Sequence, residues 1–223
     1  MGVTIDNDTT HSPAGYANTD TIAAFDCSGV DSRLFVGVFY KDTDSIAGVE
    51  ADGNAMTLRS GSQNVQGGTA GVEVWEYTID NASFDVTTSQ PSYKEIAFTA
   101  VALAGVDQAT PTIGTPVLGD GYNSDVSASY TGEVGNMLMV VINVQGTRTL
   151  TVSGITLIDT FQPASGIGAC LIGYVEATGS AQTVGASITG GVTNWRISVV
   201  EVKAASGAAV TIGAARRGAA MMM

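Results

Sequence analysis

Basic residues, histidine and long apolar runs are all scarce in this sequence of 223 residues. Only nine Lys and Arg residues stand against 21 Asp and Glu, and the formal net charge at pH 7 is −12. Binding to nucleic acids or to anionic membranes needs a basic surface, so the composition argues against both classes of partner. No apolar run approaches the roughly 20 residues of a membrane-spanning helix. We therefore expect neither nucleic acid nor membrane among the partners.

The residues of most catalytic sites are also missing. Nucleophilic triads need a base, and the one histidine, His11, lies in a polar N-terminal stretch. Glu73 and Glu76 lie three residues apart on an expected strand, so they point to opposite faces and cannot flank one bond. We predict no catalytic residue and no enzymatic activity.

Cysteine is limited to Cys27 and Cys170. A disulfide between them is one interpretation, and two buried free thiols are the other and the favoured one. The first residues have neither the basic nor the apolar segment of a secretion signal, so we expect a chain made in the cytoplasm.

The pattern along the chain is typical of an all-β protein. Apolar residues do not recur with a helical period, and Val-rich runs of six to eight residues alternate with Gly-, Asn- and Asp-rich turns. Many short strands at this spacing indicate a sandwich or barrel. The clearest strands are expected at 33–40, 72–79, 96–103, 137–144, 169–175 and 197–202.

Three of these runs recur in the same order about 100 residues later. Residues 33–40 match 136–143 at an offset of 103, 71–77 match 168–174 at 97, and 93–101 match 194–202 at 101. We interpret this as a duplication, which gives either two β-sandwiches or two halves that share one core. The expected parts are an N-terminal arm (1–25), sandwich 1 (26–109), a linker (110–125), sandwich 2 (126–205) and a C-terminal tail (206–223).

The match also pairs Tyr77 with Tyr174 as equivalent core positions, and a role in stacking on sugars is the less favoured interpretation. Residues 33–40 and their match 136–143 are nearly continuous apolar runs, so both are expected to be central strands that are buried on two faces.

An acidic segment offers the only candidate metal site. Asp42 and Asp44 form a D-x-D pattern, with Asp31 and Asp52 near them in sequence. Calcium takes six to eight oxygen ligands, which acidic loops of sandwiches can supply. The spacing of an EF-hand is missing, so a solvated acidic loop is the favoured interpretation and no cofactor is predicted.

The last twenty residues are rich in Ala and Gly and cannot form a core of their own. We predict that this tail docks on a neighbouring chain; a segment folded back on its own domain is the alternative. Since the rest of the chain is acidic, an identical subunit would suit the arginines, and solvated arginines are the other interpretation. The interface candidates are Arg216, Arg217, Met221, Met222 and Met223.

Several stretches resemble the repeated sandwich modules of bacterial surface proteins: SRLFVGV at 32–38, GVEVWEY at 71–77, and AVALAGVD at 100–107 with TP at 110–111. The second copy lacks the closing GVD…TP pattern. The acidic, charge-poor, Gly- and Thr-rich chain as a whole resembles the virion accessory proteins of tailed bacteriophages, over residues 30–205.

This resemblance implies two tandem antiparallel sandwiches of jelly-roll type with extended terminal arms. It also implies a structural function as a capsid decoration protein, a head spike or a tail-fibre component, located in the virion. The implied partners are other virion proteins and further copies of the chain.

A carbohydrate- or receptor-binding sandwich module is the alternative function, with a host glycan as its partner. Such a module needs exposed aromatic side chains at the edges of the sandwich, and the same residues would serve as interface anchors. The candidates are Tyr16, Tyr122, Tyr130 and Trp195.

Overall fold

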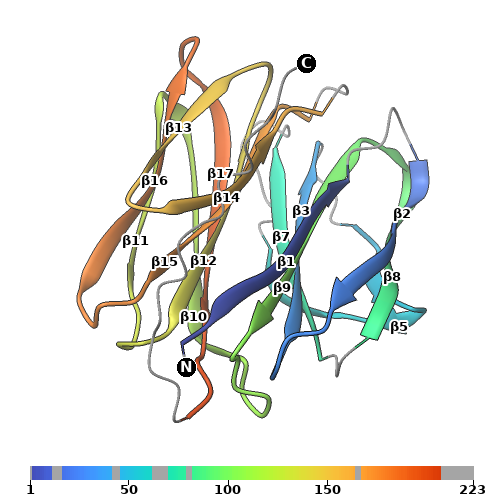
Figure 1. The fold of residues 1–223 in the computed structure, drawn as a ribbon. Coiled ribbons are helices and arrows are strands. Elements are labelled where there is room, and N and C mark those ends of the chain that lie inside the picture. The colour runs from blue at the N-terminus through green and yellow to red at the C-terminus, as the bar shows by residue number, and fades with distance from the viewer. Residues whose placement is uncertain are drawn as a thin grey trace, which may run out of the picture.

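The computed structural model describes residues 2–11, 17–41, 46–61, 70–78, 82–163 and 167–206, and these residues form an all-β protein (Figure 1). The first half contains β1 (Thr4–His11), β2 (Ala17–Cys27), β3 (Arg33–Tyr40), β4 (Gly48–Ala51), β5 (Asn54–Ala55), β6 (Thr57–Gly61), β7 (Gly71–Thr78), β8 (Ala82–Lys94) and β9 (Ile96–Ala104). The second contains β10 (Thr112–Asn123), β11 (Asp125–Thr131), β12 (Met137–Val144), β13 (Thr149–Ser153), β14 (Thr156–Phe161), β15 (Ala169–Glu176), β16 (Ala181–Thr189) and β17 (Thr193–Val202).

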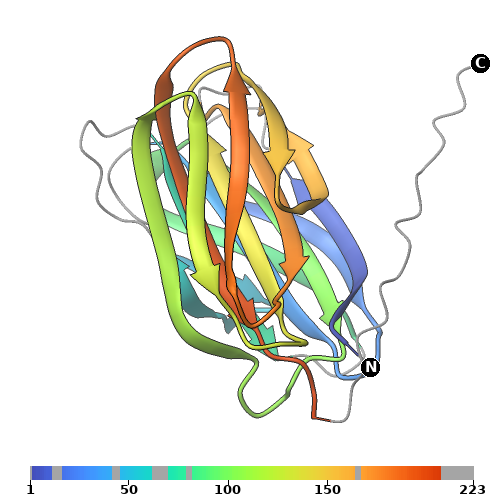
Figure 2. The same cartoon turned by 90° about the vertical axis from the view of Figure 1, so that its left-hand side faces the viewer.

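These strands form four antiparallel sheets that stack in four layers (Figures 1 and 2). Outer sheet 1 has the order β2-β8-β4-β5 and covers inner sheet 1, whose order is β1-β9-β3-β7-β6. Inner sheet 2, with the order β10-β17-β12-β15-β14, packs on the other face of inner sheet 1 and is covered in turn by outer sheet 2, β11-β16-β13.

Three apolar cores separate the four layers, and β3 shows how one strand serves two of them. Leu34 and Val36 face the first core, between outer and inner sheet 1, whereas Phe35 and Phe39 face the middle core, between the two inner sheets. Alternate residues of a strand point to opposite faces. Because both faces are covered, the inner strands carry the uninterrupted apolar runs of the sequence.

The middle core joins the two halves. The rings of Phe39 and Phe161 meet edge to face with centroids 5.4 Å apart, and the buried hydroxyls of Ser60 and Ser198 are 2.6 Å apart. Asn143 of inner sheet 2 donates its Nδ2 to two backbone carbonyls of inner sheet 1, those of Tyr40 (3.2 Å) and Gly71 (3.0 Å). Each half is thus a sandwich of two sheets with a core of its own, and the middle core packs the two sandwiches on each other.

The two halves also have the same strand order. In the inner sheets, the order β1-β9-β3-β7-β6 corresponds strand by strand to β10-β17-β12-β15-β14. In the outer sheets, β2-β8-β4 corresponds to β11-β16-β13. This equivalence is what a duplication would leave behind; the duplication itself stays a prediction.

The pairing register corrects the offsets of the repeat. Arg33 pairs with Thr78, and its equivalent Met137 pairs with Glu176. The structural offsets are therefore 104 for β3 and β12 and 98 for β7 and β15, each one residue longer than the sequence match. A slip of one residue moves every side chain to the other face.

This slip makes the expected equivalence of Tyr77 and Tyr174 wrong. Tyr77 packs against the first core, whereas Tyr174 packs against the middle core. The sequence could not set the register because strands that are apolar on both faces lack the alternation that would distinguish the two faces.

The expected N-terminal arm (1–25) and linker (110–125) are also corrected, because both form strands. β1 pairs with β9 along the edge of inner sheet 1, β2 pairs with β8 in outer sheet 1, and β10 pairs with β17. These strands were missed because they are rich in Thr, Asp, Asn and Gly: they lie at sheet edges, where water covers one side. The predicted tail lies outside the described residues from 207 onward.

Candidate functional site

The aspartates proposed for calcium act in turns. Asp31 has a φ of 52°, and its carbonyl accepts the N–H of Val106 (3.2 Å). Asp52 has a φ of 48°, and its Oδ1 accepts the N–H of Asp85 (2.7 Å). Among the residues that the structure describes, no group of three or more His, Cys, Asp or Glu side chains is placed to hold a metal ion. Asp42 and Asp44 lie outside the described residues.

The aromatic candidates divide into one exposed and two buried residues. Tyr122 is 68% exposed at the end of β10, as a binding residue would be. Tyr130 and Trp195 are only 6% and 4% exposed, so the expectation that they are exposed is wrong. Tyr130 lies on the inward face of β11, and Trp195 packs over Gly121 and donates its Nε1 to Asn123 (2.8 Å). Tyr16 lies outside the described part.

The two cysteines are free and buried, which confirms the favoured interpretation. Burial raises the pKa of the Cys27 thiol to about 12 and that of Cys170 well above its usual range, so both behave as apolar core residues. The interface candidates Arg216, Arg217, Met221, Met222 and Met223 all lie beyond the described residues.

An open groove of about 600 Å³ lies on the second half, where β10 and β11 form the edges of adjacent sheets. The pairing of β10 with β17 is interrupted between Ile113 and Val117, and this irregularity makes room for the groove. The lining comprises residues 113–115 and Val117 of β10, residues 129–131 of β11, and Glu133, Glu201 and Lys203.

The floor of the groove is a fixed polar network around Glu201, which is 3% exposed. Its Oε1 accepts the backbone N–H of Glu133 (2.6 Å) and the Nδ2 of Asn136 (2.7 Å). Burial, and then the charge of Glu201 and a hydrogen bond to it, raise the pKa of the Tyr130 hydroxyl to about 12. The carboxylate is therefore held in place by donors from the β11–β12 turn and from β11.

One glycine lets the two walls approach each other. Gly114 has a φ of +70°, and a Cβ at this position would lie 2.6 Å from the Tyr130 hydroxyl and 3.7 Å from Glu201 Oε2. The second carboxylate oxygen therefore faces the β10 wall. At the other end, Lys203 Nζ is 2.9 Å from Asp107 Oδ2. The N–H of Thr110 and Lys203 lower the pKa of Asp107 to about 2.

Glu201 was not predicted as a site residue, although a signal for it exists. It is a carboxylate inside the apolar run ISVVEV, and its structural equivalent in the first half is Ala102. The sequence match, at an offset of 101, compared Glu201 with Ala100, whereas the pairing of β9 and β17 gives an offset of 99.

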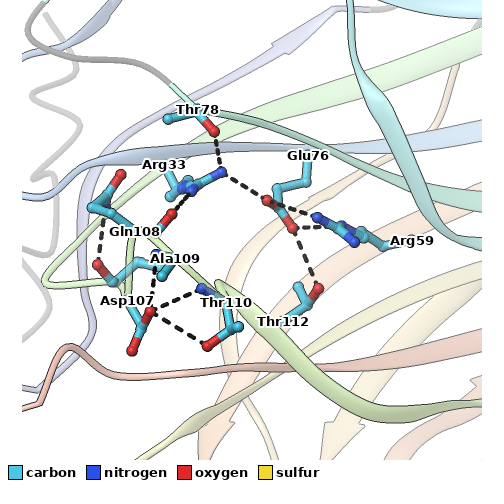
Figure 3. Close-up of polar contacts among 10 residues, drawn as sticks. Arg33, Arg59, Glu76, Thr78, Asp107, Gln108, Ala109, Thr110 and Thr112 are labelled. Atoms are coloured by element: carbon cyan, nitrogen blue, oxygen red, sulfur yellow. Dashed lines mark hydrogen bonds and ion pairs between the residues drawn. The ribbon is translucent and has the colours of Figure 1, made fainter.

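A second polar cluster joins four strands at the end of the middle core (Figure 3). Glu76, 2% exposed, accepts from Arg33 (2.9 Å) and Arg59 (2.7 Å), and Thr112 of β10 reaches it at 3.4 Å. Arg33 also donates to Thr78 and to the carbonyl of Gln108. These contacts hold β3, β6, β7 and β10 together, which is a structural role.

Glu73 is the other buried carboxyl with distinctive chemistry. Its side chain is fully buried, and the indole of Trp75 donates to its Oε2 (2.8 Å). Burial raises the pKa of Glu73 to about 7, although hydrogen bonds from Trp75, Ile46 and Tyr40 oppose the shift. This carboxyl therefore takes up or releases a proton near neutral pH.

No family model, curated protein or solved structure matches this chain. Within the described residues, the structure contains no helix with the length and apolarity to cross a membrane.

Proposed function

We propose that this chain is a non-enzymatic structural protein of a bacteriophage particle, of the capsid decoration, head-spike or tail-fibre type. The observation that supports it is the stack of four sheets around a shared middle core. A protein part that works outside the cell needs a rigid body that persists without disulfides, and both cysteines here are free. Three continuous cores supply that rigidity by burial alone.

The chemistry of the surface agrees with this proposal. A net charge of −12 keeps a surface that is poor in charged residues soluble. The partners are other virion proteins and further copies of the chain, and association with them adds stability by mass action. The location is the virion. The C-terminal segment, with Arg216 and Arg217, makes contact with the neighbouring subunit.

Light scattering tests the assembly step on the full chain and on a chain that ends after Ser206. The cut follows Ser206 because Ala204 and Ala205 donate backbone hydrogen bonds to Asn136 (3.0 Å) and Gly105 (2.9 Å) and belong to the folded body. We expect a defined oligomer for the full chain and a monomer for the shortened one. If both the full chain and the shortened chain are monomers, assembly through this segment is contradicted.

A carbohydrate- or receptor-binding module is the second candidate, and the open groove beside Tyr130 and Glu201 favours it. Glycan-array binding distinguishes it. Ser129→Arg places a large side chain in the groove, and Ser127→Arg places the same side chain on an equally exposed position of β11 outside it. A binding module loses glycan binding only with the Ser129 variant, whereas a purely structural part gives no signal with any of the three chains.

A further inference from the structure

We infer that the groove between β10 and β11 is the receptor for the arginine-bearing C-terminal segment, residues 207–223, of a second copy of this chain. The inference rests on the proposed function, because it identifies the surface on which the terminal segment of a neighbouring subunit docks. Three independent features of the molecule lead to it: the acceptors in the groove, the distribution of basic residues, and the position at which the described chain ends.

The groove is built to accept hydrogen bonds from a cation. A carboxylate has about four acceptor positions. Glu133 and Asn136 donate to Glu201 Oε1, the Tyr130 hydroxyl also hydrogen-bonds the carboxylate, and Oε2 lies nearest the wall at Gly114, which leaves about one acceptor position. The interruption of the β10–β17 ladder adds backbone groups of residues 114–116, which have no partner in that ladder. Charged acceptors and backbone carbonyls together suit the planar, five-donor guanidinium of arginine.

The chain has few cations that remain for such a site. Nine Lys and Arg residues are present, and two of them are Arg216 and Arg217. Five of the others contact a carboxylate of their own half or of a neighbouring strand: Arg33, Lys41, Arg59, Arg196 and Lys203. In a chain of charge −12, the adjacent pair Arg216–Arg217 is therefore the concentrated basic feature that complements an acidic groove.

The residues on either side of this pair suit a narrow groove. The sequence GAARRGAA at 213–220 places only Ala and Gly next to the two arginines. Small side chains let a backbone come close to the groove walls, where the exposed residues Thr115 and Ser129 stand. Large neighbours would hold the guanidinium groups away from Glu201.

The end of the described chain favours a second copy over the same copy. Lys203 lines the groove, but Ala204 and Ala205 then bond to Asn136 and Gly105, which are not part of its lining. The chain thus leaves its own groove before residue 207. Nine residues lie between Ser206 and Arg216, and the ten Cα-to-Cα steps that join the two span at most about 35 Å, which is long enough to reach a neighbouring subunit. Contact of a tail with another copy's groove is a head-to-tail interaction that builds rings or longer assemblies.

Disulfide trapping between two differently tagged full chains tests this inference. One chain carries Ser129→Cys in the groove wall, and the other carries Gly218→Cys beside the arginine pair. Cys27 and Cys170 are buried, so they do not compete. The matched control replaces Ser129→Cys with Ser127→Cys, an equally exposed β11 position outside the groove. The mixtures equilibrate in a glutathione buffer, and the mixed disulfide is quantified on a non-reducing gel.

We expect at least ten-fold more mixed disulfide from Ser129→Cys than from Ser127→Cys. Adding Arg216→Ala and Arg217→Ala to the second chain should reduce the first yield to the level of the control. Equal yields at both positions, or a yield that does not depend on the arginines, would overturn the inference. So would a doubly substituted chain, Ser129→Cys with Gly218→Cys, that forms only an internal disulfide.

The outcome is distinguishable from failure of the proposed function. If light scattering shows an oligomer that depends on residues 207–223 while trapping is unselective, assembly holds and the groove is not the receptor. If the full chain is a monomer and no mixed disulfide forms, assembly through this segment and the groove inference both fail.

Discussion

Replacing Glu73 by Gln should make the protein more stable at alkaline pH and leave its stability near pH 5 much less changed. Glu73 is fully buried, and its pKa is raised from 4.5 to about 7, first of all by burial. The folded state therefore holds the proton more tightly than the unfolded chain does. The stability that this proton contributes is complete below pH 4.5 and is lost as the pH rises through 7.

The magnitude follows from the size of the shift. Each pKa unit corresponds to 1.36 kcal/mol, so a rise from 4.5 to about 7 corresponds to a loss of roughly 3 kcal/mol above pH 8. Glutamine carries no charge at any pH. Its side-chain oxygen can still accept the hydrogen bond that the Trp75 indole donates to Glu73 Oε2 (2.8 Å) in the natural chain. The variant should thus gain up to about 3 kcal/mol over the natural chain at pH 8 to 9.

Urea unfolding between pH 5 and 9, followed by tryptophan fluorescence, measures this difference. Glu50→Gln is the matched control, because Glu50 is exposed on β4 and its replacement changes the net charge equally. The free energy of unfolding of Glu73→Gln should exceed that of Glu50→Gln by an amount that grows from pH 5 to pH 9. A constant difference across this range would show that Glu73 keeps its ordinary pKa and would refute the reasoning.

Three further predictions concern the polar contacts and the thiols. Glu76→Gln removes the charge between two arginines and should cost about 3 kcal/mol in urea unfolding, because a buried cation loses its partner. Ser198→Ala should cost about 1–2 kcal/mol by leaving the buried Ser60 hydroxyl unpaired, and adding Ser60→Ala should cost less than the sum of the two single changes. Cys27 and Cys170 should react with a thiol reagent only at the rate of unfolding, and reaction of the native protein within seconds would contradict their burial.

The sequence predicted the strands that carry most of the core. Residues 33–40 and 137–144, expected as central strands, are β3 and β12, and each is buried along its whole length. Their continuous apolar pattern shows that both faces of each strand are covered, but it does not show which sheet covers each face. That the two sandwiches also pack on each other depended on contacts such as Asn143 to Gly71, which only the structure shows.

The edge strands and the groove could not be predicted from the sequence, for a different reason. β1, β2 and β10 are polar because one side of each meets water, and their composition is also that of loops. Tyr130 was named as a binding candidate, and it does line the groove, but through its hydroxyl and not as an exposed ring. Glu201 pairs with Leu138, and only the pairing register shows that its equivalent in the first half is Ala102, which pairs with Leu34.

The most direct test of the account is to look for the chain in particles. Phage particles released from the host that carries this gene would be banded in a density gradient and probed with an antibody against the folded body. We predict that the chain sediments with the particles in a fixed ratio to their major structural protein and that a chain ending after Ser206 does not. A chain found only in the soluble fraction would contradict a structural role in the virion.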